Sequence, residues 1–262
     1  MQISLLGCGW LGLPLAKLLA GQGYTIKGST TSADKLAVLQ SAGIQPFHID
    51  LNNPDANVLH SFLEGSSVLI IAIPPKVKAD SAISYPDKIK SLLPFIAKAG
   101  IDKVLFTSST SVYADDESIP VITEETVANP DTESGRQVLA AEEVLRDAAF
   151  KATITRLGGL MGPDRHPVVH LAGRQGLQNP EAPVNMASQH HILAIILKII
   201  QRDAWGETFV ITDLEHPTRQ SFYSGEAKKR GLPLPEFETI NAPKGKLVNG
   251  GAKIMRLLDY HF

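Results

Sequence analysis

The chain has 262 residues, a formal net charge of −2 at pH 7, and 44% hydrophobic and 20% charged residues. A charge this close to zero gives no reason to expect nucleic-acid binding, and no apolar run reaches the roughly 18 residues that a membrane span requires. The start lacks the features of a signal peptide, and the single cysteine excludes an intrachain disulfide. We therefore expect a cytoplasmic protein.

The beginning of the chain predicts a dinucleotide-binding turn. A short apolar strand leads into a glycine-rich string, and a helical pattern follows it directly. Gly7 would allow a tight turn, Gly9 a close approach of the backbone to a pyrophosphate, and Gly12 close packing of helix and strand. The start of the helix would offer free N–H groups to phosphates. The string reads Gly7-Cys8-Gly9-Trp10-Leu11-Gly12.

Strand-like and helix-like segments alternate through the first 157 residues. This alternation predicts an α/β protein whose doubly wound parallel sheet has helices on both faces, a Rossmann-type NAD(P)-binding domain over residues 1–157. Expected strands lie at 2–6, 24–27, 44–49, 68–73, 104–106 and 152–157, and expected helices at 13–20, 32–42, 85–98 and 134–149.

The texture of the sequence changes after residue 157. A stretch rich in Gly, Pro and His is followed by an expected helix at 189–201, a strand at 208–211, a helix at 218–230 and a short final helix. We expect residues 158–262 to form a small C-terminal α+β cap, intertwined with the first domain and unable to fold alone. Such a cap over the carboxyl edge of the sheet would complete a substrate cleft.

The segment after the second expected strand bears on the choice of nucleotide. It reads Lys27-Gly28-Ser29-Thr30-Thr31-Ser32 and has no acid before Asp34. Hydroxyls together with Lys27 and Lys35 suit a 2′-phosphate, which an acid would repel. We therefore favour NADP(H), with NAD(H) as the alternative. A second alternative is that these hydroxyl residues only cap the following helix and do not contact a ligand.

Several motifs resemble a known family. The segment Phe106–Tyr113 resembles the strand-five motif of the extended short-chain dehydrogenases/reductases, of the NAD-dependent epimerase/dehydratase type. Asp50-Leu51, Ala72-Ile73-Pro74, Arg156 and Gly162-Pro163 stand where that family has its adenine, phosphate and substrate-loop motifs. The segments 9–12, 134–136 and 162–167 are most similar to a bacterial atypical branch, the YeeZ-type proteins.

The fingerprint and this resemblance together imply a set of cofactor-binding residues that follow successive strands. They are Gly7, Gly9, Trp10, Leu11, Gly12, Ser29, Thr30, Thr31, Ser32, Asp50, Leu51, Ala72, Ile73, Pro74, Ser108 and Gly159.

The family's catalytic pair is absent from this sequence. In active members a Tyr and a Lys, four positions apart on one helix, move the proton while hydride is transferred. Ser134 stands in the Tyr position and Val138 in the Lys position, in register with Ala141-Glu142. A serine hydroxyl is a poor acid at neutral pH, and valine cannot supply a charge. The sequence therefore argues against the ordinary mechanism.

Other residues are candidates for the missing roles. Ser109 falls at the family's catalytic Ser/Thr position, with a turn hydroxyl as the alternative. Tyr113 is a candidate phenol, with packing as the alternative. Four further residues are candidates for substrate contact, with solvated or structural roles as alternatives. They are Arg136, Arg165, His166 and Asn185.

We expect no metal site. His166, His170, His190 and His191 lack a recognised ligand spacing and thiolate partners. His190 or His191 could instead act as a base, although a helix-cap role is the simpler alternative.

Two functions from different classes remain. The first is an NAD(P)-dependent oxidoreductase or nucleotide-sugar epimerase/dehydratase-like enzyme, acting on a small polar or phosphorylated substrate. The second is a non-catalytic, dinucleotide-binding sensor or regulatory protein. A third hypothesis keeps the fold without nucleotide binding. The resemblance also implies a homodimer through helices 85–98 and 134–149, and no nucleic-acid or membrane partner is expected.

Overall fold

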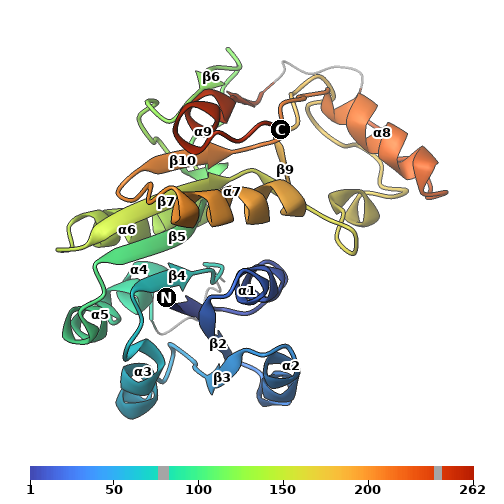
Figure 1. The fold of residues 1–262 in the computed structure, drawn as a ribbon. Coiled ribbons are helices and arrows are strands. Elements are labelled where there is room, and N and C mark those ends of the chain that lie inside the picture. The colour runs from blue at the N-terminus through green and yellow to red at the C-terminus, as the bar shows by residue number, and fades with distance from the viewer. Residues whose placement is uncertain (76–82, 239–243) are drawn as a thin grey trace.

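The computed structural model describes residues 1–75, 83–238 and 244–262. In these residues, a seven-stranded parallel sheet forms the centre, with the strand order β10-β7-β5-β4-β1-β2-β3 (Figure 1). The order reverses between β1 and β4, and in open α/β sheets ligands bind beyond the carboxyl ends of the strands at this point. The strands are β1 (Gln2–Leu6), β2 (Thr25–Thr30), β3 (Gln45–His48), β4 (Val68–Ile71), β5 (Lys103–Ser109), β7 (Lys151–Leu157) and β10 (Thr208–Ile211).

Helices cover both faces of the sheet, as expected for a doubly wound fold (Figure 1). Along β1, Ile3 and Leu5 face one hydrophobic cluster and Leu6 faces the other, because side chains alternate along a strand. One cluster joins α1 (Gly12–Gly21), α2 (Leu36–Ser41), α7 (Gln189–Gln201) and α9 (Gly251–Leu258). The other joins α3 (Ala56–Leu63), α4 (Tyr85–Lys90), α5 (Leu93–Ala99) and α6 (Glu133–Arg146).

Three expectations about these elements were wrong in detail. The helix expected at 85–98 is two helices, α4 and α5, because Pro94 has no N–H to donate to the carbonyl of Lys90. Strand β2 continues to Thr30, so two of the hydroxyl residues assigned to a loop lie in the sheet. Helix α3 was not expected at all. Asp55 caps it by accepting from the N–H groups of Asn57 and Val58.

The later part of the chain contributes to the sheet as well as to the cap. Strand β10 pairs with β7 at the sheet edge. The cap has a small core of its own, centred on Val168, Met186 and Tyr223. The boundary at residue 157 stays a prediction. The remaining elements are β6 (Val121–Ile122), β8 (Gly159–Met161), β9 (Met186–Ser188), β11 (Leu247–Val248), α8 (Arg219–Lys229) and the 3-10 turns η1 (Ala33–Lys35), η2 (Thr110–Val112) and η3 (Pro167–His170).

Within the described ranges, no helix combines the length and the apolar character needed to span a bilayer.

Candidate functional site

The glycine-rich turn has the geometry that its sequence predicts. Gly7 has a φ of +102°, and a Cβ there would lie 2.7 Å from the carbonyl oxygen of Ala72. A Cβ on Gly12 would lie 2.1 Å from the carbonyl oxygen of Gly7. A Cβ on Gly9, by contrast, would have no neighbour within 4 Å. Two glycines are therefore required by the protein's own packing, whereas the third leaves open space over the turn.

The backbone at the start of α1 is open to an anion. No described residue accepts a hydrogen bond from the N–H of Trp10 or Leu11. Free N–H groups at a helix start, aligned with the positive end of the helix dipole, bind phosphate. The residues present therefore fit the pyrophosphate of a dinucleotide.

Ser29, on the neighbouring strand β2, holds the glycine-rich turn by two hydrogen bonds. Its hydroxyl accepts from the N–H of Gly7 at 3.0 Å, and its carbonyl accepts from the N–H of Cys8 at 2.7 Å. Ser29 is 2% exposed. Its hydroxyl is therefore engaged with the turn, and Ser29 holds the glycine backbone in place.

Of the other groups that we assigned to a 2′-phosphate, some are engaged within the protein and others are accessible. Lys27 donates to the carbonyls of Ser61 and Glu64, both at 2.7 Å, beside the end of α3. That helix leads into the start of β4, so the Lys27 cation lies at the opposite edge of the sheet and its assignment was wrong. Thr30 is buried and accepts from the N–H of Ser32. The more accessible hydroxyls are those of Thr31 and Ser32.

The remaining cofactor candidates all follow strands of the parallel sheet. Asp50 and Leu51 come after β3, residues 72–74 come after β4, and Gly159 comes after β7. The carboxyl ends of parallel strands lie at one edge, so these segments lie along the same edge of the sheet as the glycine turn. Asp50 accepts from the backbone and side chain of Asn52.

Trp10 connects the glycine turn to the cap. Its indole N–H donates to Asp164 Oδ1 at 2.8 Å, and the guanidinium of Arg165 lies 5.2 Å from the ring centroid. A Cβ on Gly162 would lie 2.6 Å from the indole. Gln189, at the start of α7, donates to the Trp10 carbonyl at 3.0 Å. The cofactor turn and the loop after β8 are thus held together.

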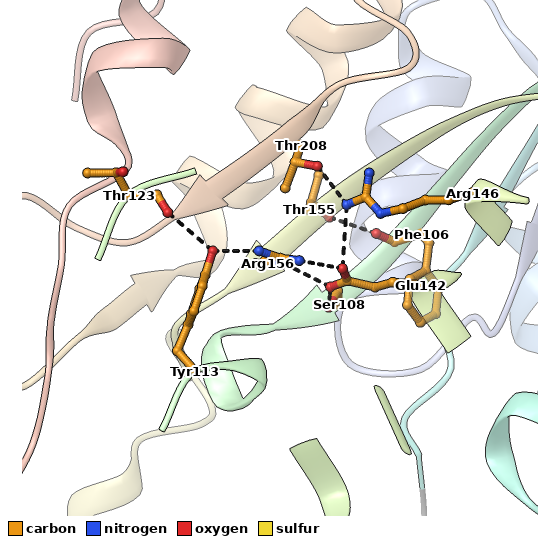
Figure 2. A network of polar contacts seen from close by, with 9 residues as sticks. All are labelled: Phe106, Ser108, Tyr113, Thr123, Glu142, Arg146, Thr155, Arg156 and Thr208. Carbon is orange, nitrogen blue, oxygen red and sulfur yellow. Dashed lines mark hydrogen bonds and ion pairs between the residues drawn. The ribbon is translucent and has the colours of Figure 1, made fainter. Parts of the chain in front are cut away.

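A buried polar network lies between β5, β7 and α6 (Figure 2). Glu142 is fully buried and accepts from Arg156 Nε at 3.0 Å and from Arg156 Nη2 at 2.6 Å. Ser108 donates to the same carboxylate. Burial disfavours the charge on Arg156, but the hydrogen bonds and charge of Glu142 outweigh it, so the pKa of Arg156 is raised. Ser108 therefore belongs to this network through its side chain.

Tyr113 belongs to the same network. Its hydroxyl accepts from Arg156 Nη1 at 2.6 Å and donates to the carbonyl of Thr123 at 3.2 Å. The side chain is fully buried, and burial raises the pKa of the phenol despite the neighbouring Arg156. This placement favours the packing alternative for Tyr113 over a catalytic one.

The two positions that the sequence assigns to the catalytic pair contain no acid or base. Ser134 lies in the first turn of α6 and is exposed, and Val138 is buried in the core. Ser109 ends β5 and accepts from the N–H of Ser111 at 3.1 Å, so it caps η2. This bond leaves the Ser109 proton available to a ligand, because no hydrogen bond that we find among the described residues uses it.

Of the four substrate candidates, three have structural partners. Arg136 is exposed and pairs with Glu133. Both ends of the Asn185 amide are used, since it donates to the carbonyl of Lys246 and accepts from the N–H of Val248, each at 2.8 Å.

His166 is buried, accepts from the N–H of Val168, and faces Glu226 at 3.4 Å. Burial lowers the pKa of His166, which favours its neutral form. Arg165, the fourth candidate, lies beside Trp10.

Sequence reasoning missed a cationic cavity next to the end of β5. The cavity has a volume of about 210 Å³ and lies between Thr110, residues 182–186, α8 and the segment 244–246. Its cations are Arg219, Lys244 and Lys246, and its carboxylate is Asp115. The signal in the sequence was weak, because these residues are far apart along the chain.

A larger hollow of about 710 Å³ lies in the cap, between α8 and the end of the chain. Asp213, Glu215 and Glu226 give it an acidic lining, and it includes no residue of the glycine turn. His191 lines it and pairs with Tyr260. Among the described residues, no group of three or more His, Cys, Asp or Glu is placed to hold a metal ion.

A parallel sheet with this strand order, a glycine turn with open N–H groups and a cap over the carboxyl edge define an NAD(P)-binding Rossmann protein. A family model described as NAD(P)H-binding matches residues 7–202. Protein YeeZ of Escherichia coli K12 is 30% identical over 266 residues, covering 100% of this chain and 95% of YeeZ. The chain therefore belongs to the NAD(P)H-binding family and is a homologue of YeeZ.

Solved structures agree on the fold. UDP-glucuronic acid 4-epimerase of Bacillus cereus, solved with NAD, has a TM-score of 0.82 and 19% identity, covering 100% of this chain and 93% of that one. A short-chain dehydrogenase/reductase superfamily protein of Agrobacterium tumefaciens, with bound NAD, has a TM-score of 0.79 and 18% identity, covering 100% and 92%. The resemblance inferred from the motifs is confirmed.

Proposed function

We propose that this protein is an NAD(P)-dependent oxidoreductase of atypical mechanism, acting on an alcohol or carbonyl of a small polar or phosphorylated substrate. The observation that carries the proposal is the open space above Gly9 beside the unpaired N–H groups of Trp10 and Leu11. Open space directly over free N–H groups at the start of a helix is what a pyrophosphate needs, and this combination, rather than the empty space alone, supports the proposal.

The proposed chemistry depends on Ser109. A reduced nicotinamide, when bound, supplies a hydride. The Ser109 hydroxyl, fixed at the end of β5 by its bond from Ser111, would donate to the carbonyl oxygen and orient it. Because Ser134 and Val138 offer no proton, the proton would come from water or from the cap.

The hydroxyls of Thr31 and Ser32 support a preference for NADP(H), and NAD(H) remains the alternative. The Bacillus cereus neighbour is solved with NAD, so the preference needs a direct measurement.

Calorimetric titration with NADPH and NADH tests the cofactor site. We expect NADPH to bind more tightly than NADH. Gly9→Ala adds only a methyl group in open space, so it should fold normally yet weaken NADPH binding at least about tenfold, because the methyl group takes the place of the pyrophosphate. Gly21→Ala is the matched control, since a Cβ there also meets nothing within 4 Å. Equal binding to both variants would overturn the proposal, as would no binding of either nucleotide.

A non-catalytic sensor is the second candidate, and the absence of an acid or base at positions 134 and 138 favours it. NADPH oxidation with a panel of small carbonyl compounds separates the two. Turnover that falls in Ser109→Ala supports the enzyme. Tight cofactor binding without any turnover supports the sensor.

A further inference from the structure

The cavity beside β5 contains an arginine with no polar partner. No described residue makes a hydrogen bond or an ion pair with the side chain of Arg219, which is half-buried as a whole, and its Nε atom is buried without a partner. The guanidinium carbon lies 6.0 Å from the centroid of the Tyr223 ring. A buried donor left unsatisfied is costly and uncommon in folded proteins. Its partner is then expected to be a ligand.

The charges around this arginine select an anion. Lys246 already donates to the carbonyl of Tyr113 at 2.6 Å and to Asp115 at 3.0 Å, so that carboxylate is neutralised. Lys244 lies only at the limit of an ion pair, 4.0 Å from Asp131, and is half exposed. Arg219, which has no carboxylate partner among the described residues, and Lys244, which also interacts with Asp116, thus leave a net positive charge at the cavity. A phosphomonoester carries about −1.5 to −2 at pH 7, which suits a net positive charge.

The size of the cavity limits the rest of the ligand. Its volume of about 210 Å³ is below the range of about 300–1,000 Å³ that is typical of sites for drug-sized molecules. Its wall is fixed, because Asn185 bonds both Lys246 and Val248 through its amide. A nucleoside diphosphate sugar is larger than this cavity, whereas a small phosphomonoester is not.

The position of the cavity connects it to the proposed chemistry. Thr110 lines it and directly follows Ser109 at the end of β5. Gly159, after β7, donates to the carbonyl of Asn185, another lining residue. A phosphate at Arg219 would therefore anchor a small molecule whose other end lies toward Ser109.

We propose that the cavity binds the phosphate of a small phosphomonoester, held by Arg219 and Lys244, and that it rejects nucleotide sugars. This inference rests on the proposed function and narrows its substrate. It separates this chain from the neighbour solved with UDP-glucuronic acid and NAD.

Calorimetry with glycerol 3-phosphate, glycerate and UDP-glucose tests the inference, on wild type and on Arg219→Gln and Lys244→Gln. We expect glycerol 3-phosphate to bind, glycerate to bind at least about tenfold more weakly, and UDP-glucose not to bind. Arg219→Gln should weaken glycerol 3-phosphate at least about tenfold, and Lys244→Gln by a smaller factor. Arg256→Gln is the matched control, because Arg256 is exposed on α9 and lines neither cavity.

Three results would overturn the inference: tighter binding of UDP-glucose than of glycerol 3-phosphate, equal binding to wild type and Arg219→Gln, or no binding of any of the three compounds. Titration of the same preparations with NADPH separates this failure from that of the proposed function. If NADPH binds normally while any of these three results is obtained, the proposed cofactor site stands and only the proposed phosphomonoester site is rejected. Thermal unfolding of both variants shows whether each is folded.

Discussion

Arg156 and Arg219 lie in neighbouring regions of the molecule but differ in their partners. Arg156 bonds Glu142 through two nitrogens and Tyr113 through a third, and it is 6% exposed. Arg219 lines a cavity, and its side chain makes no hydrogen bond or ion pair with a described residue. Tyr113 links the two regions, since its hydroxyl bonds Arg156 and its carbonyl bonds Lys246.

The difference shows how to separate folding roles from binding roles among buried polar groups. A polar group that must be buried for packing reasons acquires partners within the chain. A buried polar group without such partners either lowers the stability of the fold or forms its hydrogen bonds with a ligand. The network around Glu142 should therefore govern stability, and the cavity around Arg219 should govern binding.

The largest expected effect on stability is that of Glu142→Gln. Removing one partner of a buried ion pair leaves the Arg156 charge uncompensated, so the free energy of unfolding should fall by about 3–5 kcal/mol. Urea denaturation measures it. The neighbouring Glu143 is exposed, so Glu143→Gln should stay within about 0.5 kcal/mol of wild type. Arg219→Gln removes a donor that has no partner in the folded chain, so it should not lower the free energy of unfolding, and a large loss there would break the comparison.

Tyr113→Phe should have a smaller effect. It keeps the ring and removes the bonds to Arg156 and Thr123, so the free energy of unfolding should fall by about 1–3 kcal/mol. NADPH affinity, measured by calorimetry, should not change. Unchanged stability together with lost turnover would instead make Tyr113 the phenol that the sequence suggested as an alternative.

The smallest effect concerns pH and His166 in the cap. Burial, with the charge of Arg230, lowers the pKa of His166 in the folded state, while Glu226 opposes the shift. The unfolded chain then binds the proton more readily, so the contribution to stability is present above about pH 6.5 and is lost as the pH falls below it.

His166→Asn tests this expectation, because it keeps an acceptor for the N–H of Val168 but removes the titration. The Tm of wild type should fall more than that of the variant between about pH 7.5 and about pH 5.5. Parallel changes in the two proteins would show that another group carries the pH dependence.

The features that the sequence predicted well are those determined by backbone geometry and by contacts between residues close together in the chain. The glycine turn depends on residues that follow one another, and steric contact alone determines Gly7 and Gly12. The alternation of strands and helices, and hence the sheet, follows in the same way. The break before α5 was also available from Pro94, and we overlooked it.

The polar pairs were not predictable in the same way, because they join distant segments. Glu142 lies on the buried face of α6 with Val138, Ala141 and Leu145, and a carboxylate among apolar residues is a signal of a buried partner. Nothing in the sequence says that the partner is Arg156. Lys27 was assigned to a ligand because its type suited a phosphate, whereas its direction depends on the sheet.

The residues that close the cavity have a consequence for how the chain is made. The contact between Lys246 and the carbonyl of Tyr113 joins residues 133 positions apart, and β11 near the end pairs with β6. During synthesis the glycine turn emerges first and can begin to fold early, because domains form from the N-terminal side. The cavity wall can form only after residue 248 has left the ribosome. The proposed phosphate site is therefore completed only after nearly the whole chain has been made.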